Sequence, residues 1–104
     1  MGAKEITDST FSTETSNGVV MVDFWAPWCA PCRMVAPVLD EIQKDLGDKV
    51  KIVKMNVDEN PEIASKLSVT SIPTLVVYKN GELVERTVGA GPKQLYMNIL
   101  NKYI

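Results

Sequence analysis

The only two cysteines of the chain, Cys29 and Cys32, lie in the segment WCAPC and are separated by two residues. Cysteine pairs serve as metal ligands, as structural disulfides or as redox-active dithiols. The chain has no histidine, whereas a zinc site needs three or four protein ligands drawn mostly from Cys and His. Two thiolates do not complete such a site within one chain, so we expect no metal there. A metal shared between two chains stays open as an alternative.

The spacing of the cysteines also argues against a purely structural disulfide. A link that encloses only Ala30 and Pro31 closes a very short loop, which has little effect on the entropy of the unfolded chain. The absence of histidine further excludes Ser-His-Asp triads and Cys-His pairs, because both use imidazole as the base. The remaining interpretation is a reactive pair that exchanges disulfides.

The composition indicates one folded domain without a polyanionic partner. A chain of 104 residues that is 45% hydrophobic and 23% charged suits a single domain over residues 1–104 with a modest core. The net charge is -2, and Lys and Arg are scattered, so we expect no binding of nucleic acid. The N-terminus does not resemble a signal peptide, and no apolar run approaches the ~20 residues of a membrane span. We therefore expect neither export nor a membrane association.

The segments on either side of the cysteines predict that the pair lies between a buried strand and a helix. Residues 19–26 are apolar on both alternating faces except at Asp23, as in a central strand that is buried on both sides of a sheet. After the cysteines, apolar residues recur at helical spacing until a stop signal at Gly47. Cys29 therefore falls near the N-terminus of the helix, and Cys32 lies one turn inside it.

The pattern of strands and helices continues beyond this helix. Residues 50–57 predict a second strand, and Asn60-Pro61 predicts a capped start of a short helix. Residues 74–78 and 83–88 predict two further strands. Asn80-Gly81 between them is typical of a tight hairpin turn, so these two strands must be antiparallel.

Two further elements are predicted at the ends of the chain. Residues 4–7 predict an edge strand, and Asp8 is a candidate cap for a short helix around Phe11. Pro37 is expected to kink the helix that follows the cysteines. An apolar stripe predicts a last helix that contains Leu95, Tyr96, Ile99, Leu100 and Tyr103.

The sequence resembles the thioredoxin family over its whole length. The motifs that carry the resemblance are Phe24-Trp25-Ala26-Pro27-Trp28-Cys29, Pro37, Lys54, Ile72-Pro73-Thr74, Lys79-Asn80-Gly81 and Val88-Gly89. Together they are far more specific than a lone CxxC. One position departs from the family motif, because Ala30 stands where glycine is usual; this affects the tuning of the redox potential rather than the chemistry. The resemblance implies an α/β thioredoxin fold, a mixed central sheet of about five strands flanked by about four helices.

The position of each cysteine suggests its role. A thiolate is the nucleophile in disulfide exchange, and a helix N-terminus stabilises it through the dipole and the free backbone N–H groups. Cys29 is therefore the expected nucleophile. Cys32 lies within reach of the mixed disulfide that Cys29 forms, so it is the expected resolving thiol.

Asp23 is the one charged residue of an otherwise apolar strand. Burial raises the pKa of a carboxyl group, and a carboxyl that titrates near neutral pH beneath Cys32 can accept the proton of that thiol. The family resemblance implies the same role. The alternative is an aspartate at a strand end that reaches water. Lys54 breaks the apolar pattern of the next strand and is a candidate partner for Asp23, with a solvated surface lysine as the alternative.

An apolar surface around the cysteines is expected to bind the substrate chain. Its predicted members are Trp28, Ala30, Pro31, Ile72 and Pro73. The resemblance implies a cis Ile72-Pro73 bond in a loop that offers backbone groups to the substrate, with Thr74 following it into the strand. Gly89-Ala90-Gly91 either flanks this surface or forms a simple loop. For Trp25, packing in the core is the favoured interpretation.

These features predict a cytoplasmic protein-disulfide reductase that carries two electrons between proteins and needs no bound cofactor. The resemblance implies disulfide-containing proteins as substrates and a flavin-dependent thioredoxin reductase as the source of electrons, and we expect a monomer. A disulfide oxidase or isomerase with the same site stays open, as does a thioredoxin-fold binding subunit. The intact CxxC, Asp23 and Pro73 favour the enzyme over the binding subunit.

Overall fold

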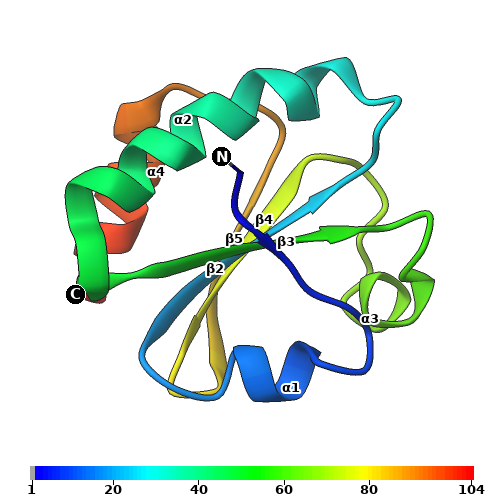
Figure 1. Ribbon diagram of the computed structural model, residues 1–104, viewed down its shortest axis with the longest axis horizontal. Helices are drawn as coiled ribbons and strands as arrows, with labels where there is room; N and C mark the ends of the chain where they lie inside the picture. Colours follow the sequence, from blue (N-terminus) through cyan, green and yellow to red (C-terminus); the bar gives the residue numbers. More distant parts are fainter. Residues whose placement is uncertain (1) are drawn as a thin grey trace.

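In the computed structural model, which describes residues 2–104, one mixed sheet lies between two layers of helices (Figure 1). The strands are β1 (Lys4–Glu5), β2 (Val19–Trp25), β3 (Lys51–Asn56), β4 (Thr74–Lys79) and β5 (Glu82–Val88). The helices are α1 (Phe11–Glu14), α2 (Ala30–Leu46), α3 (Pro61–Lys66) and α4 (Lys93–Asn101), with a short 3-10 turn at Gly47–Lys49 after α2. The α/β fold with a five-stranded mixed sheet is confirmed.

The strand order is β1-β3-β2-β4-β5, which places β2 at the centre of the sheet. β3 is parallel to both β1 and β2, whereas β4 is antiparallel to β2 and to β5. Asp23 of β2 therefore has a neighbour on each side, Lys54 on β3 and Leu75 on β4. The predicted edge strand, central strand and hairpin are all confirmed.

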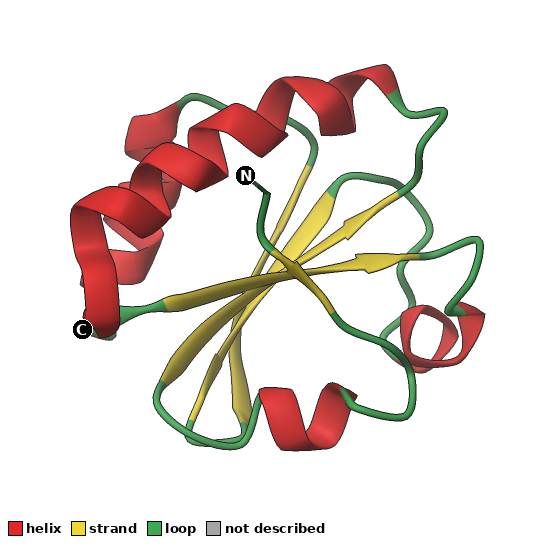
Figure 2. Ribbon diagram, in the orientation of Figure 1, coloured by secondary structure: helices red, strands yellow, loops and turns green. Residues whose placement is uncertain are grey.

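Each face of the sheet is covered by its own pair of helices, α2 and α4 on one face and α1 and α3 on the other (Figure 2). β2 supplies both cores, because its successive side chains point to opposite faces. Val19 and Met21 pack beneath α2 and α4, whereas Val20, Val22 and Phe24 pack against the other layer. Burial of such side chains stabilises the fold by about 1.5–3 kcal/mol each. By the same alternation, Asp23 shares the face of α2.

The hairpin between β4 and β5 follows from its two turn residues. Asn80 has φ 50° and Gly81 has φ 87°, the left-handed conformations that a tight two-residue hairpin turn requires and that Asn and Gly tolerate best. Lys79 pairs with Glu82 across the turn. The turn is tied to the start of β2, since the Asn80 side chain accepts a hydrogen bond from the N–H of Gly18 at 2.8 Å.

The predicted cap of α1 is wrong. Thr10 occupies the N-cap position of α1, whereas the carboxylate of Asp8 accepts hydrogen bonds at 3.0 Å from the N–H groups of Glu62 and Ile63. Asp8 therefore caps α3. Asn60 stands at the N-cap position of α3 as predicted, but its side-chain oxygen accepts from the N–H of Asp8 at 2.9 Å. Three hydrogen bonds thus join two segments that lie far apart in sequence.

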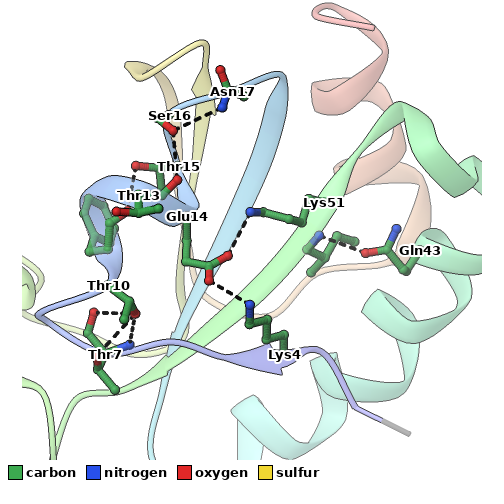
Figure 3. A network of polar contacts seen from close by, with 12 residues as sticks. Lys4, Thr7, Thr10, Thr13, Glu14, Thr15, Ser16, Asn17, Gln43 and Lys51 are labelled. Carbon is green, nitrogen blue, oxygen red and sulfur yellow. Dashed lines mark hydrogen bonds and ion pairs between the residues drawn. The ribbon is translucent and has the colours of Figure 1, made fainter.

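Polar side chains also join β1 and β3 to the helices (Figure 3). Glu14 of α1 bridges Lys4 of β1 and Lys51 of β3 at 2.7 and 2.9 Å, and the hydrogen bond from Lys4, followed by that from Lys51, lowers the pKa of Glu14 to about 2. Gln43 of α2 accepts a hydrogen bond from the N–H of Ile52 at 2.9 Å.

The helix α2 itself continues through Pro37 to Leu46, so the kink at Pro37 stays a prediction. Within residues 2–104, no helix is both long and apolar enough to cross a membrane.

Candidate active site

Cys29 and Cys32 are joined in a disulfide at the start of α2, with their Cα atoms 5.3 Å apart. Cys29 is the N-cap residue in an extended conformation, and its Sγ accepts a hydrogen bond from the N–H of Cys32 at 3.2 Å. Pro31 lies in the first turn, where its missing N–H leaves no helical hydrogen bond unmade. After reduction, the same N–H and the helix dipole stabilise a negative charge on the Cys29 sulfur.

The two sulfur-bearing residues are equally buried, with 4% of Cys29 and 3% of Cys32 exposed. Exposure therefore does not distinguish the two sulfurs, whereas their hydrogen bonding does, because the N–H of Cys32 donates to the Sγ of Cys29. The loop before the helix is held by Arg33, whose guanidinium donates to the carbonyl oxygen of Pro27 at 2.8 Å. Sequence reasoning did not single out Arg33. Within residues 2–104, no cluster of three Cys, His, Asp or Glu side chains is arranged to hold a metal ion.

Asp23 lies behind the disulfide, with 4% of the residue exposed. It lines a cavity of about 90 Å³ together with Trp25, Cys32, Arg33, Ala36 and Lys54. Its Oδ1 atom has no hydrogen-bond partner within the described chain, so the charged form of the carboxyl is poorly compensated. Burial raises the pKa of Asp23 to about 7, against a smaller opposing effect of the Lys54 charge. The predicted burial is confirmed, and the alternative of a strand-end aspartate in water is wrong.

Lys54 lies opposite Asp23 in the sheet and lines the same cavity. Among residues 2–104 its ammonium forms no ion pair with Asp23; it lies over the ring of Trp25, with Nζ 4.9 Å from the ring centroid. A cation over an aromatic face is an attractive arrangement. Lys54 is half-buried, so it is neither a direct partner of Asp23 nor a freely solvated surface lysine. Its charge acts on Asp23 through the cavity.

The packing interpretation of Trp25 is confirmed in part. Trp25 is half-buried and packs beside the small cluster of Ala26, Cys29 and Cys32, outside the two main cores. Its buried indole N–H has no hydrogen-bond partner within the described residues. The reason lies in its position, since Trp25 is the last residue of β2, where the strand leaves the layers of helices and enters the site.

The loop before β4 lies against the cysteines. The Ile72-Pro73 peptide bond is cis, as the family resemblance implies, and the carbonyl oxygen of Ile72 lies 3.8 Å from the Sγ of Cys29. The carbonyl oxygen of Pro73 accepts from the N–H of Gly89 at 2.8 Å. Thr74 is buried, and its hydroxyl donates to the carbonyl oxygen of Ser71 at 2.5 Å. The structure thus brings together two of the predicted segments, 72–74 and Gly89.

The apolar surface around the disulfide differs in part from the prediction. Trp28 is 67% exposed and donates its indole N–H to Asp58 at 2.9 Å, and Ala30 and Pro31 are also exposed. Ile72 is half-buried, whereas Pro73 and Thr74 are buried and add no exposed apolar area. Two exposed apolar side chains were not predicted, Met34 of α2 at 70% and Val88 of β5 at 58%. Val88 pairs with Thr74 across the sheet, a neighbour that only the strand register reveals.

A disulfide at a helix N-terminus, with a buried carboxyl group behind it and a cis-proline loop against it, is the arrangement of a dithiol–disulfide oxidoreductase.

Comparisons with known proteins agree with this class of site. Residues 2–102 match the family model described as Thioredoxin. The chain is 56% identical to a thioredoxin of Bacillus subtilis over the whole length of both proteins. It is 58% identical to a thioredoxin of Listeria monocytogenes over 97% of this chain and 98% of that one. Thioredoxin 1 of Synechococcus elongatus is 53% identical over 98% and 97% of the two chains. The chain belongs to the thioredoxin family.

Proposed function

We propose that Cys29 attacks the disulfides of substrate proteins, that Cys32 resolves the mixed disulfide and that Asp23 accepts the proton of Cys32. The observation that carries the proposal is the buried carboxyl of Asp23, with a pKa of about 7, in the same cavity as Cys32. A group that titrates near the working pH is suited to take up a proton and to release it again.

The reaction has two exchange steps. The Cys29 thiolate attacks one sulfur of the substrate disulfide, which breaks that bond and releases the first substrate thiolate, while a mixed disulfide forms with Cys29. Cys32 then loses its proton to Asp23 and attacks the Cys29 sulfur. This restores the Cys29–Cys32 disulfide and releases the second substrate thiolate. Two electrons pass to the substrate, and its two thiolates take up two protons, one of them by way of Asp23 and the other from solvent.

The substrate chain is proposed to lie over the exposed surface beside Cys29. Its apolar contacts are with Trp28, Ala30, Pro31 and Ile72. The loop of Ile72, Pro73 and Thr74, with Gly89 beside it, holds the substrate chain in register. The Ile72 carbonyl oxygen, 3.8 Å from the Cys29 sulfur, supports this position. Because this surface holds the reactive disulfide, a dimer that covered it would block the reaction, so the active form is proposed to be a monomer.

In the cell, the protein is proposed to act as a reductase in the cytoplasm and to be reduced again by thioredoxin reductase. A reductase must be returned to its dithiol form after each turnover, and the cytosol is the compartment in which thiols are kept reduced. An oxidase or isomerase would use the same site at a higher reduction potential. Equilibration with glutathione distinguishes them, because a potential above that of the cytosolic glutathione pool would contradict the proposed direction of electron flow.

Single-cysteine variants test the proposed roles. With an oxidised substrate protein, Cys32→Ser is expected to accumulate a mixed disulfide on non-reducing gels, because no resolving thiol remains, whereas Cys29→Ser is expected to form none. Accumulation on Cys29→Ser and none on Cys32→Ser would reverse the assignment. If neither variant traps a substrate that the wild-type protein reduces, the two-step mechanism is wrong.

A further inference from the structure

The hydroxyl group of Tyr96 contacts the loop between β5 and α4. Tyr96 lies in the first turns of α4 and is fully buried. Its hydroxyl accepts a hydrogen bond from the N–H of Gly91 at 2.8 Å, and it donates to the carbonyl oxygen of Gly89 at a longer 3.3 Å. One side chain thus bonds to both ends of the segment Gly89-Ala90-Gly91.

The core around the Tyr96 ring does not require this hydroxyl. The ring packs among apolar side chains of α2, α4 and the sheet, where a phenylalanine ring would bury nearly the same area. A buried hydroxyl opposes folding unless it is hydrogen-bonded, and both of its partners are backbone groups of this loop. Burial raises the pKa of Tyr96, an effect that the hydrogen bond from Gly91 partly offsets, so the phenol keeps its proton as a donor.

The backbone of the loop is shaped to accept this contact. Gly89 has φ 90°, a conformation that only glycine adopts without strain. A Cβ atom at Gly91 would lie 2.5 Å from the Leu95 side chain and 3.6 Å from the Tyr96 hydroxyl, so the loop approaches α4 closely at this point. Two glycines and one hydroxyl together hold the path of the chain here.

The same loop is bonded to the proposed substrate-binding segment. The N–H of Gly89 donates to the carbonyl oxygen of Pro73 at 2.8 Å. Hydrogen bonds therefore connect the Tyr96 hydroxyl to the carbonyl group of Gly89, and the N–H of Gly89 to Pro73, the residue after Ile72. Tyr96 itself is buried and does not reach the cysteines or their exposed surface.

We propose that Tyr96 is a positioning residue for substrate proteins, whose hydroxyl holds the Gly89–Gly91 loop against Pro73. This contact preorganises the adjoining backbone at Ile72, whose carbonyl oxygen lies 3.8 Å from the Cys29 sulfur, for the substrate chain. A loop that is already ordered does not lose conformational entropy when the substrate binds, so binding is stronger. The inference rests on the proposed function, which assigns Pro73, Thr74 and Gly89 to substrate binding. A disulfide without a peptide backbone makes no use of this preorganisation.

The test compares Tyr96→Phe with a matched control, Tyr103→Phe. Tyr103 also lies beyond β5, and its hydroxyl donates to Glu85 at 2.7 Å, so both variants lose a hydrogen-bonding hydroxyl and keep the ring. The reduced proteins are mixed with insulin, whose disulfides lie in a polypeptide, and with DTNB, a small aromatic disulfide. For Tyr96→Phe, the ratio of the insulin rate to the DTNB rate is expected to fall about fivefold, the equivalent of one typical hydrogen bond. For Tyr103→Phe the ratio is expected to match that of the wild type.

Amide hydrogen exchange gives an independent measurement on the same variants. In Tyr96→Phe the N–H of Gly91 loses its acceptor, and the N–H of Gly89 is expected to exchange faster as its bond to Pro73 loosens; Tyr103→Phe is expected to leave both protected. Unchanged protection of Gly89, or an equal fall of the insulin and DTNB rates, would overturn the positioning role. Failure of the wild-type protein to reduce insulin would instead overturn the proposed function, and the inference with it.

Discussion

Replacement of Asp23 by asparagine is expected to stabilise the protein and to slow its chemistry. Burial raises the pKa of Asp23 from its ordinary value of 3.8 to about 7, a difference of about 3 on the pH scale. Each unit corresponds to about 1.36 kcal/mol, so the ionised carboxyl opposes folding by about 4 kcal/mol above pH 7. Because the folded state binds the proton more tightly than the unfolded state, the contribution of Asp23 to stability is fully present below about pH 4 and falls as the pH rises to about 7. Asp23→Asn lacks this fall.

Urea denaturation of the oxidised proteins between pH 4 and pH 8 measures the difference. The two proteins are expected to have similar stability near pH 4 and to diverge towards about 4 kcal/mol at pH 8. Asp48→Asn, which removes a carboxylate from the exposed turn after α2, controls for the change in net charge. The rate of insulin reduction by Asp23→Asn is expected to fall, because Cys32 loses its proton acceptor. A variant that is less stable than the wild type at pH 8 and reduces insulin at the wild-type rate would refute the buried base.

Three further substitutions test separate parts of the structure. Lys54→Met removes the charge that lowers the pKa of Asp23. In the same urea series, the stability of this variant is therefore expected to go on falling to a higher pH than that of the wild type. Asp8→Ala removes the cap of α3 and is expected to destabilise the protein by about 1 kcal/mol, the usual effect of losing a capping side chain, with a matching fall in Tm. Ala30→Gly, at the exposed first position of α2, is expected to lower Tm slightly and to move the reduction potential by less than about 20 mV, since ~1 kcal/mol of helix propensity corresponds to that shift.

Each of these expectations has a result that would contradict it. An unchanged pH dependence in Lys54→Met would mean that the Lys54 charge does not reach Asp23. If Asp8→Ala has the Tm of the wild type, water replaces the capping carboxylate without a loss of stability. In Ala30→Gly, a change of the reduction potential by more than about 40 mV, measured by equilibration with glutathione, is twice what helix propensity allows. It would mean that residue 30 acts on the electrostatics of the cysteines.

The sequence by itself determined the elements and the location of the reactive pair, because the signals for both are local. The double-sided apolar run of residues 19–26, the helical spacing after Cys32 and the turn residues Asn80-Gly81 depend on neighbours within a few positions. Backbone periodicity converts such patterns into strands, helices and turns without knowledge of the rest of the chain. Asp23 was recognisable for the same reason, as the one charged residue in a buried strand.

Only the tertiary structure decided which side chains meet across the fold. Asp8 caps α3 rather than α1, and Lys54 lies over Trp25 rather than on Asp23. Val88 is exposed beside the site, and the Tyr96 hydroxyl bonds to the loop beyond β5. Aspartate, lysine, valine and tyrosine have the same local preferences in either arrangement. The choice between arrangements depends on packing between segments that are distant along the chain, and on which donors and acceptors that packing leaves within reach.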